Sequence, residues 1–263
     1  PDTALFRSGL IQAAQGQPSL KARDMEIEVV EHGPASGSRE GATTAPAAVL
    51  YEIVRKLPDG VAVELDQNGE DGQLNLRAGR YATRLNVLGV DDFPSMGAGD
   101  FPHSFNLASA TLRGLIDRTR FAISTEETRY YLNGIYLHAT DVEGEALLRA
   151  VATDGHRLAR VQAPLPAGAS GIPGVIIPRK TVSELRKLLD EAPEEIAVAL
   201  SETRIQFTVG AVVLTSKLID GTFPEYERVI PRNNNRVLRV GKRDCSDTVA
   251  RRASIRQERS RQI

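Results

Sequence analysis

The chain has 263 residues, enough for two compact domains, and its 41% hydrophobic and 25% charged residues are ordinary for a globular protein. With 33 basic and 34 acidic residues the net charge is −1, which excludes a protein that binds nucleic acid through an overall basic surface. The absence of tryptophan and an aromatic content of 5% argue against a surface that stacks nucleotide bases.

The sequence also indicates a cellular setting. Its single cysteine, Cys245, cannot form an internal disulfide or a cysteine-based zinc site, so a reducing compartment is expected. No apolar run approaches the ~20 residues that a membrane-spanning helix needs. The first residues show no basic-then-apolar signal segment. We therefore expect a cytoplasmic protein.

The first part of the chain predicts strands around one helix. Ala22-Arg23-Asp24 precedes an alternating run from Met25 to Val30, which predicts a strand. The stretch from His32 to Ala45 is rich in small residues and predicts a surface loop. Pro46 opens a helical pattern that ends near Leu57. The alternation of Leu74, Leu76 and Ala78 predicts a further strand that ends at Gly79.

The second part of the chain begins with a predicted amphipathic helix at residues 107–122. Its apolar face consists of Leu112, Leu115, Ile116 and Thr119 at spacings of three and four. The elements predicted after it are a strand at 155–161, a loop at 164–174, a helix from Pro178 to about Ala192, a strand at 205–209 and a helix at roughly 243–255.

Four features occur twice, in the same order and 130 to 132 positions apart. The matching pairs are Asp24 with Asp154 before a strand, Pro46 with Pro178 before a helix, Gly79 with Gly210 after a strand, and Phe93-Pro94 with Phe223-Pro224. One such match carries little weight, but four in the same order predict an internal duplication.

The helices divide the chain into domains. A helix at 107–122 precedes the second copy and a comparable stretch follows it, whereas none precedes the first copy. We therefore assign domains to residues 1–101, 102–227 and 228–263, with the first lacking its front and the third most of its body. A full unit contains helix, strands, helix and strands, which predicts an α+β fold with mostly antiparallel sheets.

Several segments carry a family resemblance. Ala152-Thr153-Asp154-Gly155-His156-Arg157-Leu158-Ala159, together with Arg129-Tyr130-Tyr131-Leu132-Asn133-Gly134, resembles the bacterial DNA polymerase III beta subunits, the sliding clamps. Further matching segments are Ile177-Pro178-Arg179-Lys180, Thr215-Ser216-Lys217-Leu218, Phe223-Pro224-Glu225-Tyr226 and Arg228-Val229-Ile230-Pro231. The resemblance covers nearly the whole chain, apart from a divergent tail after Asp244.

The resemblance implies three similar clamp domains per subunit, each with antiparallel sheets and two helices. In that family, two subunits close head-to-tail into a ring around duplex DNA. Measured against this pattern, the chain lacks the opening helix of the first domain and ends shortly after the first helix of the third. We therefore expect residues 1–263 alone to be monomeric or irregularly associated, with a protease-sensitive tail after about Arg232.

A sliding ring has to hold DNA through few contacts, because each neutralised phosphate adds salt-dependent affinity. The resemblance implies that helices line the ring and face the DNA. The candidate DNA-facing residues are Arg113, Arg120, Arg179, Lys180, Arg186 and Lys187, which lie opposite the apolar helix positions. A plain solvated helix face is the alternative interpretation of these residues.

The resemblance also implies a pocket for short, partly apolar peptides between the second and third domains. Its candidate residues are Leu132, Thr153, Gly155, His156, Arg157 and Leu158 on one side, and Pro224, Arg228 and Val229 on the other. Apolar walls provide affinity in such a pocket, and polar groups fix the orientation of the ligand. The rest of the pocket belongs to later parts of the third domain.

Asp154 and His156 suggest an alternative from another functional class. Two residues apart on a strand they would face the same way, as a hydrolase or a metal site would need. However, the other histidines have no ligand-like spacing to His156, and no P-loop, GxGxxG, GxSxG or HExxH motif occurs. A turn with a structural histidine is the simpler interpretation. We therefore expect no enzyme activity, no metal and no cofactor.

The sequence thus predicts a non-catalytic sliding clamp that tethers a replicative polymerase to DNA. The expected partners are duplex DNA encircled without sequence preference, the DNA polymerase III catalytic subunit, the clamp loader, other polymerases or repair proteins with short peptide motifs, and a second copy when the chain is full length. The second interpretation is a clamp fragment that cannot close a ring, and the third is the hydrolase.

Overall fold

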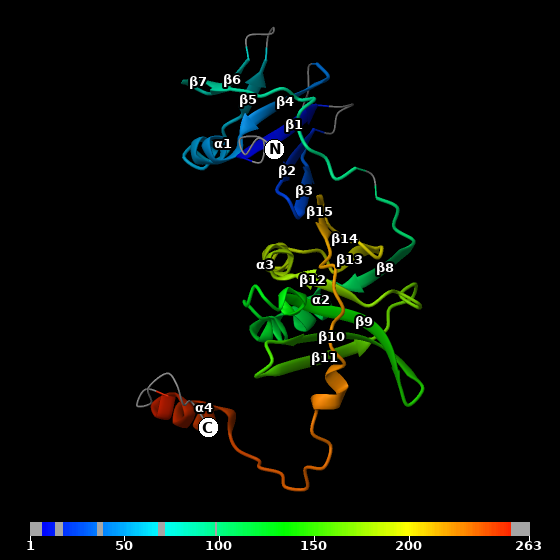
Figure 1. Cartoon of the computed structure of the whole chain (residues 1–263). Helices are drawn as coiled ribbons and strands as arrows, with labels where there is room; N and C mark the ends of the chain where they lie inside the picture. Colours follow the sequence, from blue (N-terminus) through cyan, green and yellow to red (C-terminus); the bar gives the residue numbers. More distant parts are fainter. Residues whose placement is uncertain (1–6, 14–17, 36–38, 68–71, 98, 254–263) are drawn as a thin grey trace. The chain divides into compact units, whose positions relative to one another are not determined.

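The computed structural model describes residues 7–13, 18–35, 39–67, 72–97 and 99–253. The chain forms two compact units, Pro1–Phe223 and Pro224–Ile263. The first unit contains two successive sets of strands and helices, which we call copy 1 (β1 to β7) and copy 2 (β8 to β15) (Figure 1).

Copy 1 consists of seven strands and one helix in its described part. These are β1 (Ser8–Ala13), β2 (Ser19–Arg23), β3 (Ile27–His32), β4 (Gly41–Pro46), α1 (Ala47–Val54), β5 (Val63–Asp66), β6 (Gln73–Ala78) and β7 (Tyr81–Asn86). Copy 2 has an additional strand and helix at its start.

The elements of copy 2 are β8 (His103–Ala108), α2 (Ser109–Asp117), η2 (Arg120–Ala122), η3 (Tyr130–Leu132), β9 (Gly134–Val142), β10 (Glu145–Thr153), β11 (Leu158–Pro164), β12 (Val175–Pro178), α3 (Arg179–Leu188), β13 (Glu195–Leu200), β14 (Arg204–Val209) and β15 (Val212–Lys217).

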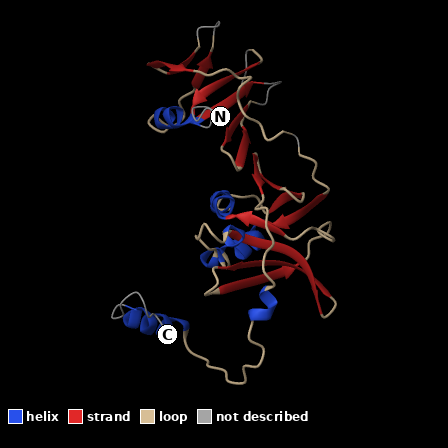
Figure 2. Ribbon diagram, viewed as in Figure 1, coloured by secondary structure: helices blue, strands red, loops and turns tan. Residues whose placement is uncertain are grey.

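The strand order repeats between the copies, as the sequence offsets predict. The order β4-β1-β2-β3 in copy 1 corresponds to β12-β9-β10-β11 in copy 2, and β5-β6-β7 corresponds to β13-β14-β15. All pairs are antiparallel, so the fold is the expected α+β arrangement (Figure 2). In copy 2, β8 extends the second sheet along the outer edge of β13.

One strand pair joins the two copies. The third strand of copy 1, β3, pairs with the last strand of copy 2, β15, from Val212 opposite Glu31 to Ser216 opposite Ile27. This pairing fuses the sheets into one of eight strands, in the order β4-β1-β2-β3-β15-β14-β13-β8. Backbone hydrogen bonds therefore continue from one copy into the other.

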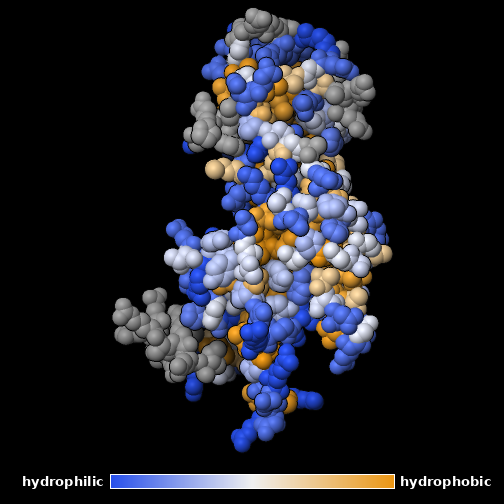
Figure 3. Space-filling model, turned by 45° about the vertical axis from the view of Figure 1, so that its right-hand side comes forward, coloured by the Kyte–Doolittle hydropathy of each residue, from blue (hydrophilic) through white to orange (hydrophobic). Residues whose placement is uncertain are grey.

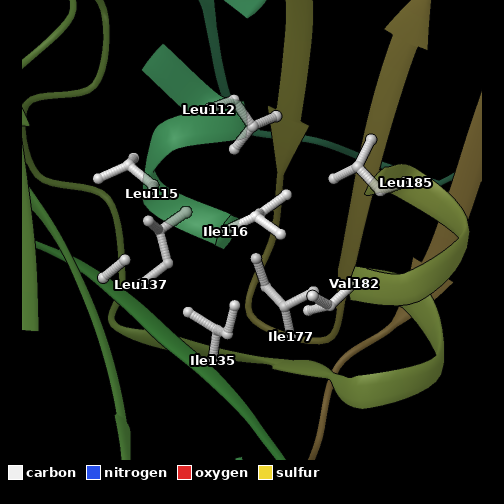
Figure 4. A pocket seen from close by; sticks show the side chains of 9 residues that line it. Leu112, Leu115, Ile116, Ile135, Leu137, Ile177, Val182 and Leu185 are labelled. Carbon is white, nitrogen blue, oxygen red and sulfur yellow. The ribbon is translucent and has the colours of Figure 1, made fainter. Parts of the chain in front are cut away.

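The main hydrophobic core lies in copy 2 beneath α2 and α3. The predicted apolar face of the first helix is confirmed, because Leu112, Leu115 and Ile116 are 2–4% exposed. Together with Val182 and Leu185 of α3 they surround a small cavity of about 20 Å³ (Figure 4). This cavity is close to the size of a single water and lined only by apolar side chains, so it is a packing gap and not a binding site.

Two predicted element boundaries are wrong. The loop expected at His32–Ala45 ends in strand β4, where Thr44 and Ala45 are fully buried. The Oγ1 of Thr44 donates to the Leu88 carbonyl (3.0 Å) and accepts the Leu88 N–H (2.7 Å). The helix expected at 107–122 ends at Asp117, and a separate 3-10 turn follows at Arg120–Ala122.

The second unit contains little regular structure. It has a 3-10 turn, η4 (Tyr226–Val229), an extended segment, and the helix α4 (Lys242–Ala253). The predicted helix at 243–255 is thus present, although its last two positions lie outside the described residues. Apolar side chains of the extended segment face solvent: Val237 and Leu238 are 82% and 83% exposed.

Candidate functional site

The Thr-Asp-Gly-His-Arg run at residues 153–157 forms the turn between β10 and β11. Its central side chain is Asp154, whose Oδ1 accepts the N–H groups of His156 and Arg157, both at 2.9 Å. The second carboxylate oxygen accepts Nε of Arg157 at 2.9 Å. Thr153 Oγ1 donates to the Arg157 carbonyl at 2.8 Å. Local hydrogen bonds therefore fix the conformation of this exposed turn.

The same turn occurs in copy 1 between β2 and β3. Oδ1 of Asp24 accepts the N–H groups of Glu26 and Ile27 at 2.7 and 2.8 Å. The other oxygen of Asp24 pairs with Lys180 at the start of α3, so this turn also ties copy 1 to copy 2. These turns explain why both following strands begin two to three residues later than their sequence patterns predict.

Both turn carboxylates have lowered pKa values. Partial burial acts to raise the pKa of Asp24, but Lys180 and the two backbone N–H groups outweigh it. At Asp154 the desolvation is also outweighed, by the N–H groups of Arg157 and His156 and by the Arg157 guanidinium. Each carboxylate is therefore held in its charged form by the fold.

These bonds also bear on the two interpretations of Asp154 and His156. Both carboxylate oxygens of Asp154 are engaged by its own turn, and the N–H of His156 is one of their donors. This arrangement favours the interpretation of Asp154 as a structural residue of the turn. Within the described ranges, no group of three or more His, Cys, Asp or Glu side chains is arranged to hold a metal ion.

One side of the candidate peptide site is assembled around this turn. Arg129 donates from Nη2 to the Asp154 carbonyl (3.2 Å) and forms an ion pair with Glu126 (2.8 Å). Gly155 has a φ of +89°, and a Cβ at this position would lie 2.5 Å from Nη1 of Arg129. Leu132 of η3 is buried, whereas Leu158 at the start of β11 is half-buried. The turn and η3 are therefore linked through Arg129.

Two exposed aromatic side chains next to this turn were not among the predicted site residues. Phe121 is 55% exposed, and the guanidinium of Arg157 lies over its ring, 5.7 Å from the centroid. Tyr130 is 53% exposed and packs edge-on against Tyr131. Tyr130 was visible in the Arg-Tyr-Tyr-Leu motif, but nothing in the sequence indicates that Phe121 is exposed.

The other predicted residues of the peptide site lie in the second unit. Pro224 precedes η4, and Arg228 and Val229 lie within it. Arg228 forms an ion pair with Glu225, three residues earlier. Val229 is 69% exposed, which is unusual for a valine in an ordered turn. These three residues therefore present two apolar side chains and one charged side chain to solvent.

The six candidate DNA-facing cations lie on and beside the paired helices α2 and α3. Arg186 of α3 donates from Nε to Asp117 of α2 at 2.7 Å, and also pairs with Asp190. Its side chain is only 20% exposed, and the two carboxylates raise the pKa of its guanidinium. The Arg186 guanidinium lowers the pKa of Asp190, and the fields of Arg113 and Arg120 act in the same direction.

The other five cations are more exposed. Lys187 pairs with Glu184 (2.9 Å), Lys180 with Asp24, and Arg120 with Asp117 (3.5 Å). Arg113 and Arg179 are exposed and form no ion pair within the described part of the chain. The helical layer therefore carries positive charge that is largely matched by carboxylates, and Arg186 acts mainly between the helices.

No helix among the described residues combines the length and the apolar character needed to cross a bilayer.

Comparisons with known proteins identify relatives along the whole chain. The family model for the N-terminal domain of the DNA polymerase III beta subunit matches residues 6–97, and that for its central domain matches residues 106–225. The beta sliding clamp of Caulobacter vibrioides is 48% identical over 263 residues, covering 100% of this chain and 71% of that protein. The Escherichia coli beta sliding clamp is 37% identical over 266 residues, covering 100% and 70%.

Solved structures give the same result. A sliding clamp from Bartonella birtlesii bound to griselimycin matches with a TM-score of 0.94 and 46% identity, over 99% of this chain and 70% of that one. The Caulobacter crescentus beta sliding clamp, solved with polyethylene glycol bound, matches with a TM-score of 0.94 and 47% identity, over 97% and 68%.

Proposed function

The chain belongs to the DNA polymerase III beta subunit family, the beta sliding clamps, and we propose that it holds duplex DNA loosely while docking the peptide tails of its partners. The family consists of processivity factors, so DNA and a DNA polymerase are its partners.

The charge arrangement on α2 and α3 is the observation that carries this proposal. Lys180, Lys187 and Arg120 each pair with a carboxylate, and Arg186 pairs with two. A phosphate that approaches these cations has to compete with acids already in place. The result is weak, sequence-independent attraction, which suits a protein that slides.

Ring closure is proposed from the β3·β15 junction. If each junction joins a third strand to a last strand, then copy 1 still offers its last strand, β7, and copy 2 still offers its third strand, β11. Both strands lie at sheet edges within the described structure. A ring closed through such junctions is heterologous and head-to-tail, and β7 and β11 would each pair with a third clamp domain, which the resemblance implies for the full-length subunit.

We also propose that the β10–β11 turn, η3 and η4 dock short peptides that carry apolar residues. Leu158 and Val229 would supply apolar contact, and Thr153, Gly155, His156 and Arg157 would supply polar groups and backbone amides. Leu132, Pro224 and Arg228 are the remaining candidate residues of this docking surface. Phe121 and Tyr130 extend the exposed aromatic surface next to this turn. The intended partners are the polymerase catalytic subunit, the clamp loader, and other polymerases or repair proteins with such tails.

The chain is proposed to act without chemistry of its own, in the cytoplasm, where a bacterial replicative polymerase meets DNA. The engagement of Asp154 in its own turn supports the first point, because both oxygens of this carboxylate already accept hydrogen bonds within the turn. Nuclease, ATPase and esterase assays with and without chelator test it, with His156→Ala as the comparison. Turnover that disappears in His156→Ala would establish the hydrolase instead.

The DNA face is tested by charge reversal with a matched control. Arg113→Glu combined with Arg179→Glu should weaken binding of a fluorescent duplex and reduce the slope of log K against log salt by about 2, one per lost phosphate contact. Arg80→Glu combined with Arg84→Glu changes the net charge equally, but on β7 and its turn in copy 1. Equal effects of the two double variants would contradict a specific DNA face.

The peptide site is tested by titrating a fluorescent peptide that ends in Leu-Phe. Val229→Asp should weaken binding by about tenfold or more, because it introduces a charge into the apolar contact. Val142→Asp is the control, since Val142 is also an exposed valine but lies at the far end of the β9–β10 hairpin. Unchanged affinity in Val229→Asp would remove this assignment.

A further inference from the structure

Two arginine side chains flank the β10–β11 turn, and they are held in different ways. Arg129 is braced from two sides, because its Nε donates to Oε2 of Glu126 at 2.9 Å and its Nη2 donates to the Asp154 carbonyl at 3.2 Å. The side chain of Arg157 is 60% exposed, against 34% for that of Arg129. Arg129 therefore supports the turn, whereas Arg157 presents its guanidinium to solvent.

The main chain of Arg157 is held by the turn itself. Its N–H donates to Oδ1 of Asp154 at 2.9 Å, and its carbonyl accepts hydrogen bonds from Oγ1 of Thr153 at 2.8 Å and from the Asp154 N–H at 3.4 Å. In the side chain, Nε donates to Oδ2 of Asp154 at 2.9 Å. Within the described ranges, Nη1 and Nη2 donate to no other group. The guanidinium is thus attached at Nε, and its two terminal nitrogens face solvent.

The ring of Phe121 provides a second contact for this guanidinium. One hydrogen bond at Nε leaves the plane of the guanidinium able to rotate. The guanidinium carbon of Arg157 lies over the Phe121 ring, 5.7 Å from its centroid. A cation within ~6 Å of an aromatic face is attracted by the quadrupole of the ring. The hydrogen bond to Asp154 and the contact with Phe121 together define the orientation of the guanidinium.

The main chain around Phe121 keeps its ring at the surface. The next two residues, Ala122 and Ile123, are 0% and 6% exposed. On the other side of η2, Thr119 is fully buried, with its Oγ1 donating to the Leu115 carbonyl at 2.6 Å and its own carbonyl accepting the Ala122 N–H at 3.0 Å. The Phe121 ring therefore cannot turn inward without displacing buried residues on both sides.

The exposure of an aromatic ring is not by itself evidence of a role. The face shown in Figure 3 carries several apolar areas among hydrophilic ones, and scattered exposed apolar side chains are normal. Copy 1 even has a similar pair on α1, where the guanidinium of Arg55 lies 5.8 Å from the ring centroid of Tyr51. The two pairs differ in location, because Arg157 lies on the proposed peptide surface and α1 lies outside all the surfaces proposed above.

We propose that Phe121 is a positioning residue for peptide docking: together with Asp154 it holds the guanidinium of Arg157 so that Nη1 and Nη2 donate to main-chain carbonyl oxygens of the docked peptide. This inference rests on the proposed peptide surface and adds to it a residue that acts through Arg157. Main-chain carbonyls occur in every peptide, so partners with different side chains can use the same contact. A guanidinium that is oriented beforehand loses less conformational freedom when the peptide binds.

Titration of the fluorescent peptide that ends in Leu-Phe tests the positioning role. Phe121→Leu removes the ring but keeps an apolar side chain, and should weaken binding by about two- to fivefold, the range of an exposed cation–π contact. Phe121→Tyr keeps the ring and should bind as the unmodified chain does. Tyr51→Leu is the matched control, because it removes the ring of the pair on α1 and should leave the affinity unchanged. Unchanged affinity in Phe121→Leu, or an equal loss in Tyr51→Leu, would overturn the inference.

A double-mutant cycle separates positioning from direct contact with the peptide. Arg157→Gln alone should weaken binding by more than Phe121→Leu, because it removes the donors themselves. If Phe121 acts through Arg157, Phe121→Leu should have little further effect in the Arg157→Gln background. An equal loss in both backgrounds would mean that the peptide contacts the Phe121 ring directly, which contradicts a positioning role.

NMR of the arginine side chains provides a measurement that needs no peptide. The Nε–H proton of Arg157 should show a ring-current shift from Phe121 and slow exchange with water, because Asp154 accepts it. Phe121→Leu should remove the shift, Phe121→Tyr should preserve it, and the signal of Arg55 should not respond to either variant. A signal of Arg157 that is the same in Phe121→Leu and in the unmodified chain would show that the ring does not orient the guanidinium.

The failure of this inference can be distinguished from failure of the proposed peptide surface. If Val229→Asp leaves the peptide affinity unchanged, the surface is wrong and Phe121 has no peptide to position. If Val229→Asp weakens binding but Phe121→Leu does not, the surface remains supported and only the positioning role is wrong.

Discussion

Copies 1 and 2 share one topology but differ in how completely their cores are enclosed. The core of copy 2 includes large side chains from both sheets and both helices, whereas the separate cluster in the described part of copy 1 has four buried side chains, Ala45, Leu74, Leu76 and Leu85. The difference follows from one strand and one helix, β8 and α2, which cover copy 2. A sheet order can thus be preserved while the burial that stabilises it is not.

The largest expected effect comes from removing equivalent core side chains in the two copies. Leu185→Ala in copy 2 should lower the free energy of unfolding by about 2–5 kcal/mol, because Leu185 is fully buried. Ile53→Ala at the equivalent position of copy 1 should cost less than half as much. Urea denaturation, followed by hydrogen exchange in each copy, measures both. Equal losses would show that α1 is as well enclosed as α3.

The next effect concerns the turns that the copies share. Gly155→Ala places a Cβ at a positive φ and against Arg129, so it should destabilise copy 2 by about 1–3 kcal/mol and disturb the peptide surface. Gly171→Ala is the control, because Gly171 also has a positive φ but has open space around it. Copy 1 has Met25 at the position of Gly155, so this close approach is specific to copy 2.

The two turn aspartates should differ in what they stabilise at low pH. Their pKa values are below the unfolded value of about 3.9, so their contribution is present above that pH and is lost as the pH falls through the folded pKa. Asp24→Asn and Asp154→Asn should therefore each reduce the acid sensitivity of the urea midpoint. Because Asp24 binds Lys180, its variant alone should loosen the junction between the copies, seen as faster exchange in β3 and β15.

The smallest effect on the free energy of unfolding should come from replacing a core residue of copy 2 with its counterpart in copy 1. Val182 and Leu50 are equivalent, so Val182→Leu adds one methylene beside the cavity of about 20 Å³. The gain from filling and the strain of repacking should nearly cancel, within about 1 kcal/mol. A loss of several kcal/mol would mean that the cavity cannot accept the added group.

Hydrophobic alternation predicted the strands that carry large apolar residues, and the large side chains of these strands are buried in the hydrophobic cores. Leu74, Leu76 and Ala78 form β6, and Ile205, Phe207 and Val209 form β14, each followed by a glycine with positive φ. Strand β4 was missed because Gly-Ala-Thr-Thr-Ala has no large side chain to alternate. Its burial comes from the neighbouring β1 and from the bonds between Thr44 and Leu88.

The candidate sites could be predicted only in part. The Thr-Asp-Gly-His-Arg motif located the β10–β11 turn. The sequence does not reveal that both carboxylate oxygens of Asp154 accept hydrogen bonds within this turn. The helix spacing predicted that Arg186 would face solvent with the other cations. Its contact with Asp117 on another helix is a tertiary property, and no local pattern encodes it. The exposure of Phe121 is also a tertiary property that no local sequence pattern encodes.

The β3·β15 pairing has a consequence for how such a protein arises in evolution. A junction made of main-chain hydrogen bonds does not need a matching pair of side chains, only two strands whose alternation agrees. A gene duplication that places two identical units in tandem would therefore yield partners that already pair at their edges. Later substitutions could then make the two copies differ in sequence, because the interface between them already exists in the main chain.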